Sequence, residues 1–128
     1  MTASWPEAQL KKIKDAREKP PASNPGTRVV ELDDHTTLII FAGYIDSSNA
    51  PDFRRVVESV LSRGASHLVC DLERIDYLGS AGAGIFIESI GKVQAAGGQM
   101  SLLNPSDKVM DVFMLLGIHD LFQVVSLN

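Results

Sequence analysis

From Arg28 onward, strand-like runs alternate with segments whose apolar residues recur at helical spacing, and this alternation is the strongest constraint on the fold. Residues 29–32 and 37–41 are rich in β-branched and large apolar side chains and are separated by the polar group Asp33-Asp34-His35. We therefore expect two strands joined as a hairpin. The largely apolar run 67–72 is typical of a strand near the centre of a sheet.

Three later segments have the apolar spacing of helices, and they are expected to span residues 49–64, 80–97 and 104–117. Asn, Ser or Asp stands at the start of each and Gly at the end, which suits helix caps. The residues expected to face the core are Phe53, Val56, Val57, Val60, Leu61, Ala83, Phe86, Ile87, Ile90, Val93, Val109, Met110, Phe113 and Leu116. With short strands at 100–103 and 121–125, the pattern predicts one α/β domain.

The residues before this domain differ from it in composition. Residues 2–19 carry many charges and few large apolar side chains, and they are expected to form a thin amphipathic helix. Pro20, Pro21 and Pro25 then predict a linker, because proline cannot continue a helix. We expect an extension and linker at 1–27 and a folded domain at 28–128. The extension is expected either to remain a free tail, as is usual for such a segment, or to dock on its own domain or on a neighbouring chain. Docking on a neighbouring chain would make a homodimer.

The charge balance and the single cysteine exclude several functions. The 12 Lys and Arg against 16 Asp and Glu give a net charge of -4, which supplies no basic face for nucleic acid. Cys70 lies within the strand-like run 67–72, and a lone cysteine forms no disulfide framework, so we expect a buried, inert thiol. No apolar stretch approaches the roughly 20 residues of a membrane span, and no signal peptide is recognisable. These features predict a cytoplasmic protein.

Small residues gather at the expected start of the helix at 80–97. Ser80 stands at the expected N-cap, where its hydroxyl could simply satisfy a free amide of the first turn. Gly79, Gly82 and Gly84 weaken a helix start, and they indicate that something approaches the backbone there. A phosphate on Ser80 would meet free amides and the positive end of the helix dipole. It would also repel a protein docked over it, so the pattern favours a phosphorylation-controlled docking site at Ser80.

Four stretches carry a resemblance to a known family. Residues 42–46 resemble its Gly-Glu-Ile-Asp turn, and residues 71–82 resemble its Asp-Leu, spacer, Asp-Ser-Ser/Thr-Gly element. Residues 96–98 and 115–122 resemble the turn after its second helix and its closing segment. In order and spacing, the domain from Val29 to Val125 resembles a STAS domain, the family of anti-sigma factor antagonists. This resemblance implies a mixed sheet of four to five strands with three to four helices mainly on one face.

The resemblance also implies partners. In that family an anti-sigma factor serine kinase phosphorylates the serine matching Ser80, the unphosphorylated antagonist binds that kinase and frees a sigma factor, and a PP2C-type phosphatase resets the serine. Asp46 matches the acidic residue on the neighbouring loop. The residues expected to contact the partner are Tyr44, Asp46, Ser47, Gly79, Ala81, Gly82 and Ile85. Three of them depart from the family pattern, since Gly79 replaces an aspartate, Ala81 a Ser or Thr, and Tyr44 an acidic residue.

Other chemistry is weakly supported. His35, His67 and His119 lack the close spacing of metal ligands, and Ser80 lacks the Gly-x-Ser-x-Gly elbow of an esterase, so we expect no metal, no cofactor and no catalytic residue. Asp71 and Asp76 are interpreted as structural. Ile85 falls off the expected apolar face, and it is expected either exposed for docking or half-buried beneath the loop at Asp46. The alternative to a switch is a STAS scaffold or subunit, stressosome-like or part of a lipid-transport complex, in which Ser80 only caps its helix.

Overall fold

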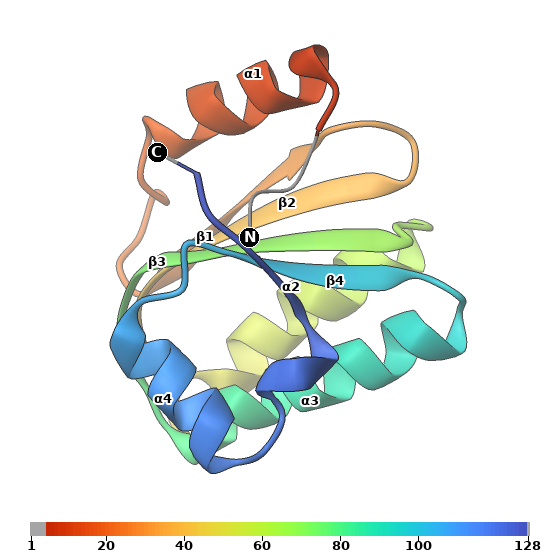
Figure 1. Ribbon diagram of the computed structural model, residues 1–128. Coiled ribbons are helices and arrows are strands. Elements are labelled where there is room, and N and C mark those ends of the chain that lie inside the picture. Colours follow the sequence, from red (N-terminus) through yellow and green to blue (C-terminus); the bar gives the residue numbers. More distant parts are fainter. Residues whose placement is uncertain (1–4, 128) are drawn as a thin grey trace.

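Five strands form one sheet in the order β1-β2-β3-β4-β5 in the computed structural model, which describes residues 5–127 (Figure 1). The strands are β1 (Gly26–Glu31), β2 (Thr36–Ile45), β3 (His67–Leu78), β4 (Gln99–Leu103) and β5 (Gln123–Val125). The helices are α1 (Glu7–Arg17), α2 (Ala50–Ser62), α3 (Ser80–Ala95) and α4 (Asp107–Leu115), with a 3-10 turn at His119–Leu121. The expected mixed α/β sheet is confirmed.

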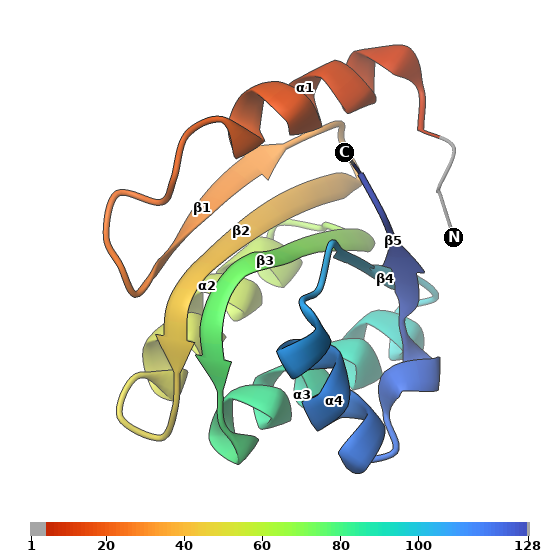
Figure 2. The same ribbon diagram turned by 60° about the vertical axis from the view of Figure 1, so that its left-hand side comes forward.

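The strand directions follow from the connections. The short polar turn between β1 and β2 makes an antiparallel hairpin, as expected, whereas β2, β3, β4 and β5 run parallel to one another. Parallel neighbours need a crossover, and α2, α3 and α4 supply one each. Consequently β2 and β3, the two central neighbours, end at the same edge of the sheet, where α2 and α3 begin (Figure 2).

The larger core lies between the sheet and helices α2, α3 and α4, which cover one face (Figure 2). Its centre is a row of aromatic rings in mutual contact, whose successive centroids are 5.3 to 6.0 Å apart. In spatial order these rings belong to Phe53, Phe41, Phe86, Phe113 and Phe122. The row runs from α2 through β2, α3 and α4 to the residue before β5, so it ties all three helices to one another.

Helix α1 covers the opposite face of the sheet (Figures 1 and 2). Its Ile13 and Ala16 are buried against a second apolar cluster, to which β2, β3, β4 and β5 all contribute. The expected helix at 2–19 is thus observed as Glu7–Arg17, and residues 2–4 lie outside the described part of the chain. Of the three alternatives for the extension, a free tail, docking on its own domain and docking on a neighbouring chain, the structure shows docking on its own domain.

Two residues expected in the core are exposed. Ile87 is 41% exposed. The buried residues of α3 form a band along the helix that includes Ala83 and Phe86, and Ile87 lies at the margin of this band, beside Glu88. Leu116 is 44% exposed because it is the C-cap of α4, where the chain turns away from the core. Both expectations were wrong, and both errors concern residues at the limit of a buried helix face.

Candidate functional site

The ends of β2 and β3 bring the loop at Asp46 and the start of α3 together. Gly79 N–H donates a 2.9 Å hydrogen bond to the Ile45 carbonyl oxygen. Asp46 follows Ile45 and Ser80 follows Gly79 in the chain. The loop after β2, which holds Asp46, and the start of α3, which holds Ser80, therefore lie together at one edge of the sheet (Figure 2).

Ser80 is the first residue of α3, and the N-cap is Gly79, in extended conformation with φ -84° and ψ 176°. The expected N-cap position of Ser80 was wrong by one residue. No side chain caps this helix end, and Ser80 is exposed. The hydroxyl of Ser80 therefore faces solvent at the positive end of a 16-residue helix, and it does not serve as the cap.

Gly82 is explained by close packing, not by access to the backbone as expected. A Cβ atom on Gly82 would lie 2.6 Å from Leu78 Cδ1 and 2.9 Å from the Ile45 carbonyl oxygen. The first turn of α3 thus lies directly on the end of β2, and only glycine fits there. Gly84 differs, because a Cβ atom there would meet nothing within 4 Å.

A pair of tyrosines borders the site. Tyr44 on β2 and Tyr77 on β3 are register partners and are 44% and 59% exposed. A Cβ atom on Gly79 would lie 3.3 Å from both Cε2 and Oη of Tyr77, so the phenol ring covers position 79. The family pattern has an aspartate immediately before the serine. In this chain that position is Gly79, and the ring of Tyr77 lies over it. Sequence reasoning missed Tyr77, and only the register of β2 with β3 could have indicated it.

The loop after β2 holds Asp46 as a fixed negative charge. Its carboxylate accepts hydrogen bonds from the hydroxyl and the backbone N–H of Ser48, at 2.5 and 2.9 Å, and these bonds lower the pKa of Asp46 below its usual value. The side chain of Asn49 closes the loop, accepting from Asp46 N–H at 3.0 Å and donating to the Tyr44 carbonyl at 2.9 Å. In such a turn, backbone N–H groups of the loop fix the orientation of the aspartate carboxylate.

The structure places most of the expected contact residues together. Tyr44, Ser47, Asp46, Gly79 and Ala81 all reach the surface around Ser80. Two others do not, because Gly82 is buried and Ile85 is only 1% exposed. The expectation that Ile85 lies exposed or half-buried was wrong: α3 turns this residue into the main core. Ile85 and Gly82 are therefore buried residues that hold the start of α3 in position, and they are not part of the exposed surface.

Two of the three histidines lie at the other edge of the sheet from Ser80: His35 and His67 stand where β2 and β3 begin. His119 lies in the turn before β5 beside Asp120. Within residues 5–127 no group of three or more His, Cys, Asp or Glu side chains could hold a metal ion. Cys70 is fully buried, and burial raises the pKa of its thiol well above the usual range. This cysteine cannot act as a nucleophile in the folded chain.

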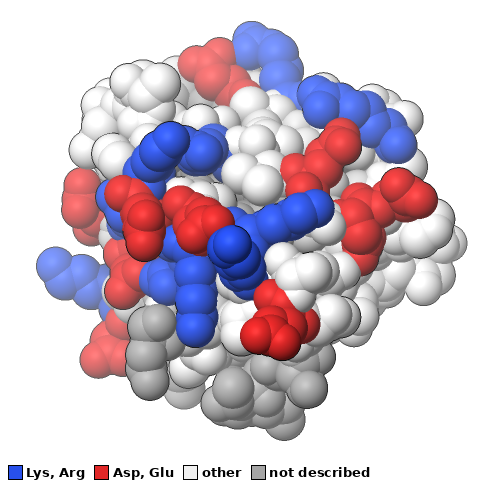
Figure 3. Space-filling model, turned by 90° about the horizontal axis from the view of Figure 1, so that it is seen from above, with Lys and Arg blue, Asp and Glu red and all other residues white. Residues whose placement is uncertain are grey.

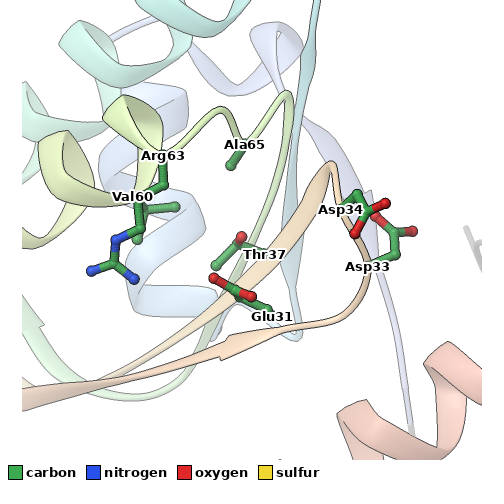
Figure 4. Close-up of a pocket in the computed structure, with 7 residues that line it drawn as sticks. All are labelled: Glu31, Asp33, Asp34, Thr37, Val60, Arg63 and Ala65. Carbon is green, nitrogen blue, oxygen red and sulfur yellow. The ribbon is translucent and has the colours of Figure 1, made fainter.

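A small hollow of about 160 Å³ lies at the far end of β2 from Asp46 (Figure 4). Glu31, Asp33 and Asp34 reach it from the β1–β2 hairpin, and Arg63 reaches it from the end of α2. The carboxylate of Asp33 is already engaged by the backbone N–H groups of His35 and Thr36, at 2.8 and 2.7 Å. The hollow is smaller than a usual ligand pocket, and one of its three carboxylates, that of Asp33, is used by the turn. Across the described residues, no helix combines the length and apolar content needed to cross a membrane.

A mixed sheet of this order, with helices α2, α3 and α4 on one face and an exposed serine at the start of α3, defines a small α/β domain. The family model described as "STAS domain" matches residues 27–127. The chain therefore belongs to the STAS domain family, and the resemblance found in its motifs is confirmed. Helix α1 lies outside the matched residues.

Relatives and solved structures agree with this assignment. The anti-sigma-B factor antagonist of Bacillus subtilis is 27% identical over 95 residues, which cover 74% of this chain and 86% of that protein. The anti-sigma factor antagonist SpoIIAA in its unphosphorylated form matches with a TM-score of 0.69 at 20% identity, over 80% of this chain and 89% of that one. The phosphorylated form of SpoIIAA, from Bacillus, matches with a TM-score of 0.67 at 19% identity, over 80% and 92%. The first two are named anti-sigma factor antagonists, and the third is named a Bacillus cell fate determinant.

Proposed function

We propose that this chain is an anti-sigma factor antagonist whose binding to its partner is controlled by phosphorylation of Ser80. The observation that carries the proposal is the position of Ser80: its hydroxyl is exposed at the start of α3 and is not the helix cap. The relatives named anti-sigma-B factor antagonist support the same function. The proposal places the protein in the cytoplasm.

In the unphosphorylated state, the surface around Ser80 docks on an anti-sigma factor serine kinase, and the kinase then releases its sigma factor. Asp46, Tyr44, Ser47, Gly79 and Ala81 form the contact surface. This surface is more aromatic and less acidic than the family pattern, because Tyr77 lies over Gly79 and Tyr44 stands beside it. Exposed tyrosines are well suited to protein contacts, since they bury much area at low entropic cost.

Phosphorylation of Ser80 ends this docking. The phosphate adds close to two negative charges at pH 7, beside the fixed charge of Asp46. The domain itself tolerates the group, because the free N–H groups of the first turn of α3 and the helix dipole favour a negative charge. The partner surface does not, since it must desolvate the phosphate to stay bound. A PP2C-type phosphatase removes the phosphate and restores docking.

A homodimer through residues 1–27 is a further partner proposal. Because Ile13 and Ala16 of α1 are buried against its own sheet, such a dimer would use the exposed outer face of α1.

The proposal is tested by incubating the chain with ATP and candidate switch kinases and measuring its intact mass. One added phosphate on Ser80 is expected, and Ser80→Ala should abolish it. Ser62→Ala is the matched control, because Ser62 is also exposed and lies at the end of α2, outside the contact surface. Ser80→Asp should weaken kinase binding. Phosphate that persists in Ser80→Ala, or no phosphate with any kinase that binds the chain, contradicts the switch.

The second candidate function is a STAS scaffold that does not switch. It is favoured by exposed apolar side chains on α4 and the following turn. They are Met114, Leu115, Leu116 and Leu121, which are 55%, 87%, 44% and 43% exposed. Exposed apolar patches mark contact surfaces, so this one suits a fixed neighbour in an assembly. An assembly that forms equally with Ser80 and Ser80→Asp would favour the scaffold.

A further inference from the structure

The outer edge of β1 carries backbone groups that have no partner strand. β1 and β5 are the two edge strands of the sheet, and β1 is the longer, with six residues against three (Figure 2). Leu32 N–H donates to the Thr36 carbonyl oxygen at 2.9 Å, and bonding toward the partner strand alternates along an antiparallel pair. The N–H and C=O groups of Thr27, Val29 and Glu31 therefore point away from β2. No loop backbone within residues 5–127 pairs with them.

The side chains of the same three residues project toward the α2 side of the sheet. Opposite residues of neighbouring strands share a face, and Thr27 and Val29 lie opposite Phe41 and Ile39, which belong to the core beneath α2. Val29 is 36% exposed and Glu31 is also exposed, so α2 leaves this margin of the sheet open. A strand added beside β1 would find free backbone groups and room on the α2 face.

Two hollows lie between β1 and α2, one toward each end of β1. The hollow at the start of β1 has a volume of about 280 Å³, and Thr27, Phe53 and Val56 line it. The hollow of about 160 Å³ at the end of β1 lies between Glu31 and Arg63 (Figure 4). Thr27 and Glu31 are four residues apart, which is roughly 13 Å along a strand. Because a cavity of about 150 Å³ can hold a benzene molecule, each hollow has room for one side chain.

The hollow at the end of β1 is acidic. The carboxylates of Glu31, Asp33 and Asp34 line it, against the single guanidinium of Arg63. Backbone N–H groups that donate to Asp33 lower the pKa of its carboxyl, so this group stays ionised. A Lys or Arg side chain would complement this charge.

The hollow at the start of β1 is apolar at its base. Phe53 is 4% exposed, and Val56 packs against the main core. The carboxylate of Asp52, the acidic residue of this hollow, already accepts from Arg55 at 2.7 Å. This hollow suits an apolar side chain.

We propose that the free edge of β1 is a docking site for an extended segment of a partner protein, which adds to the sheet antiparallel to β1. The segment carries Lys or Arg opposite Glu31 and an apolar residue four positions later, opposite Thr27, so that these two side chains enter the two hollows. Backbone hydrogen bonds to Thr27, Val29 and Glu31 provide affinity, and the hollows provide specificity.

A second copy of this chain fits the same edge less well. Pairing β1 with β1 about a twofold axis at Val29 would engage all the outward backbone groups. It would also place Glu31 of one copy opposite Thr27 of the other, at the apolar hollow. Burying a carboxylate there without a partner is costly. The charges of the two hollows therefore favour a partner segment with a basic residue.

The test uses the synthetic peptide acetyl-Thr-Lys-Thr-Val-Thr-Leu-Thr-amide, in which Lys and Leu have the required spacing. Its titration into the isotope-labelled full chain is followed by NMR. Saturable shifts are expected at the amides of Thr27, Val29 and Glu31, with a dissociation constant below about 1 mM. These amides should exchange readily with solvent in the unbound chain and become protected in the complex. Glu in place of the peptide's Lys should weaken binding at least about fivefold.

Variants of the chain and the peptide test the backbone contribution and the charge. Val29→Pro removes an outward N–H, which an edge strand can lose without losing its own ladder, and it should abolish binding. N-methylation of the peptide's Val should do the same. Glu31→Lys should weaken binding of the Lys peptide about fivefold. Glu18→Lys is the matched control: it makes the same charge change on α1, on the side where Lys and Arg are interspersed with Asp and Glu (Figure 3), and should leave the affinity unchanged.

Four results would overturn the proposal. The first is the absence of saturable shifts at β1, or shifts confined to another surface. The second is binding that survives N-methylation of the peptide, a result that does not depend on whether Val29→Pro folds. The third is equal affinity for the Lys and Glu peptides. The fourth is a shift of the β1 amides with protein concentration alone, which would assign the edge to a second copy.

Discussion

Gly82 lies in the first turn of α3, where there is no room for a methyl group. In Gly82→Ala the new Cβ would lie 2.6 Å from Leu78 Cδ1, 2.8 Å from Ile45 Cγ2 and 2.9 Å from the Ile45 carbonyl oxygen. Side chains can rotate away, but that carbonyl is backbone and already accepts from Gly79 N–H at 2.9 Å. The start of α3 must therefore shift away from β2, and Ser80 shifts with it.

Two opposing effects set the magnitude. Overpacking of this kind costs about 1–3 kcal/mol, while alanine gains about 1 kcal/mol over glycine within a helix. The net expectation for Gly82→Ala is a loss of up to about 2 kcal/mol in the free energy of unfolding. Gly84→Ala is the matched control, because its Cβ meets nothing within 4 Å. It should gain up to about 1 kcal/mol.

Urea denaturation followed by circular dichroism measures both variants against the unaltered chain. The midpoint of Gly82→Ala should fall and that of Gly84→Ala should rise, with unchanged slopes. If Gly82→Ala is as stable as Gly84→Ala, the close approach of α3 to Ile45 does not exist in solution, and the account of how Ser80 is positioned fails with it.

Three further predictions concern the core and the strands. Cys70 should not react with a thiol reagent until the chain unfolds, since burial keeps the thiol protonated; rapid labelling of the native protein would contradict its placement. Burial lowers the pKa of His67 from the usual 6.5. As the pH falls below about 6.5 the unfolded chain therefore takes up a proton first, and the melting temperature should fall more steeply than in His67→Gln; parallel profiles would refute this. Phe113→Ala removes the ring between Phe86 and Phe122 and should cost about 3–5 kcal/mol in urea denaturation, and a loss under 1 kcal/mol would argue against the aromatic row.

The sequence predicted most elements of the sheet and its helices because local signals agreed with the final packing. Gly64 and Gly117 end α2 and α4 with φ values of +96° and +70°, a conformation that favours glycine. The polar turn at 33–35 predicted the hairpin. At these positions local backbone chemistry and tertiary structure require the same residue, so the pattern was sufficient.

The rest depended on contacts between distant parts of the chain. The expected strand at 67–72 continues to Leu78, because β3 accommodates two shifts in its register with β2. Asp71 was interpreted as structural, but its partner Arg17 lies 54 positions earlier. No local spacing predicts such a pair.

The candidate site was predicted in outline and corrected in detail. Ser80 and Asp46 do lie together, as the motifs implied. The residues that support them were misread, because the burial of Ile85 and the packing of Gly82 depend on how α3 lies against β2. Helical periodicity gives the spacing of a buried face but not its width when a helix packs against both a sheet and other helices.

The most direct measurement is the affinity of the chain for its anti-sigma factor kinase by calorimetry, with Ser80 unmodified and with Ser80 phosphorylated. The account predicts tight binding of the unmodified chain and a loss of at least about tenfold, 1.4 kcal/mol, on phosphorylation. Equal affinity of the two forms would contradict control of docking at Ser80.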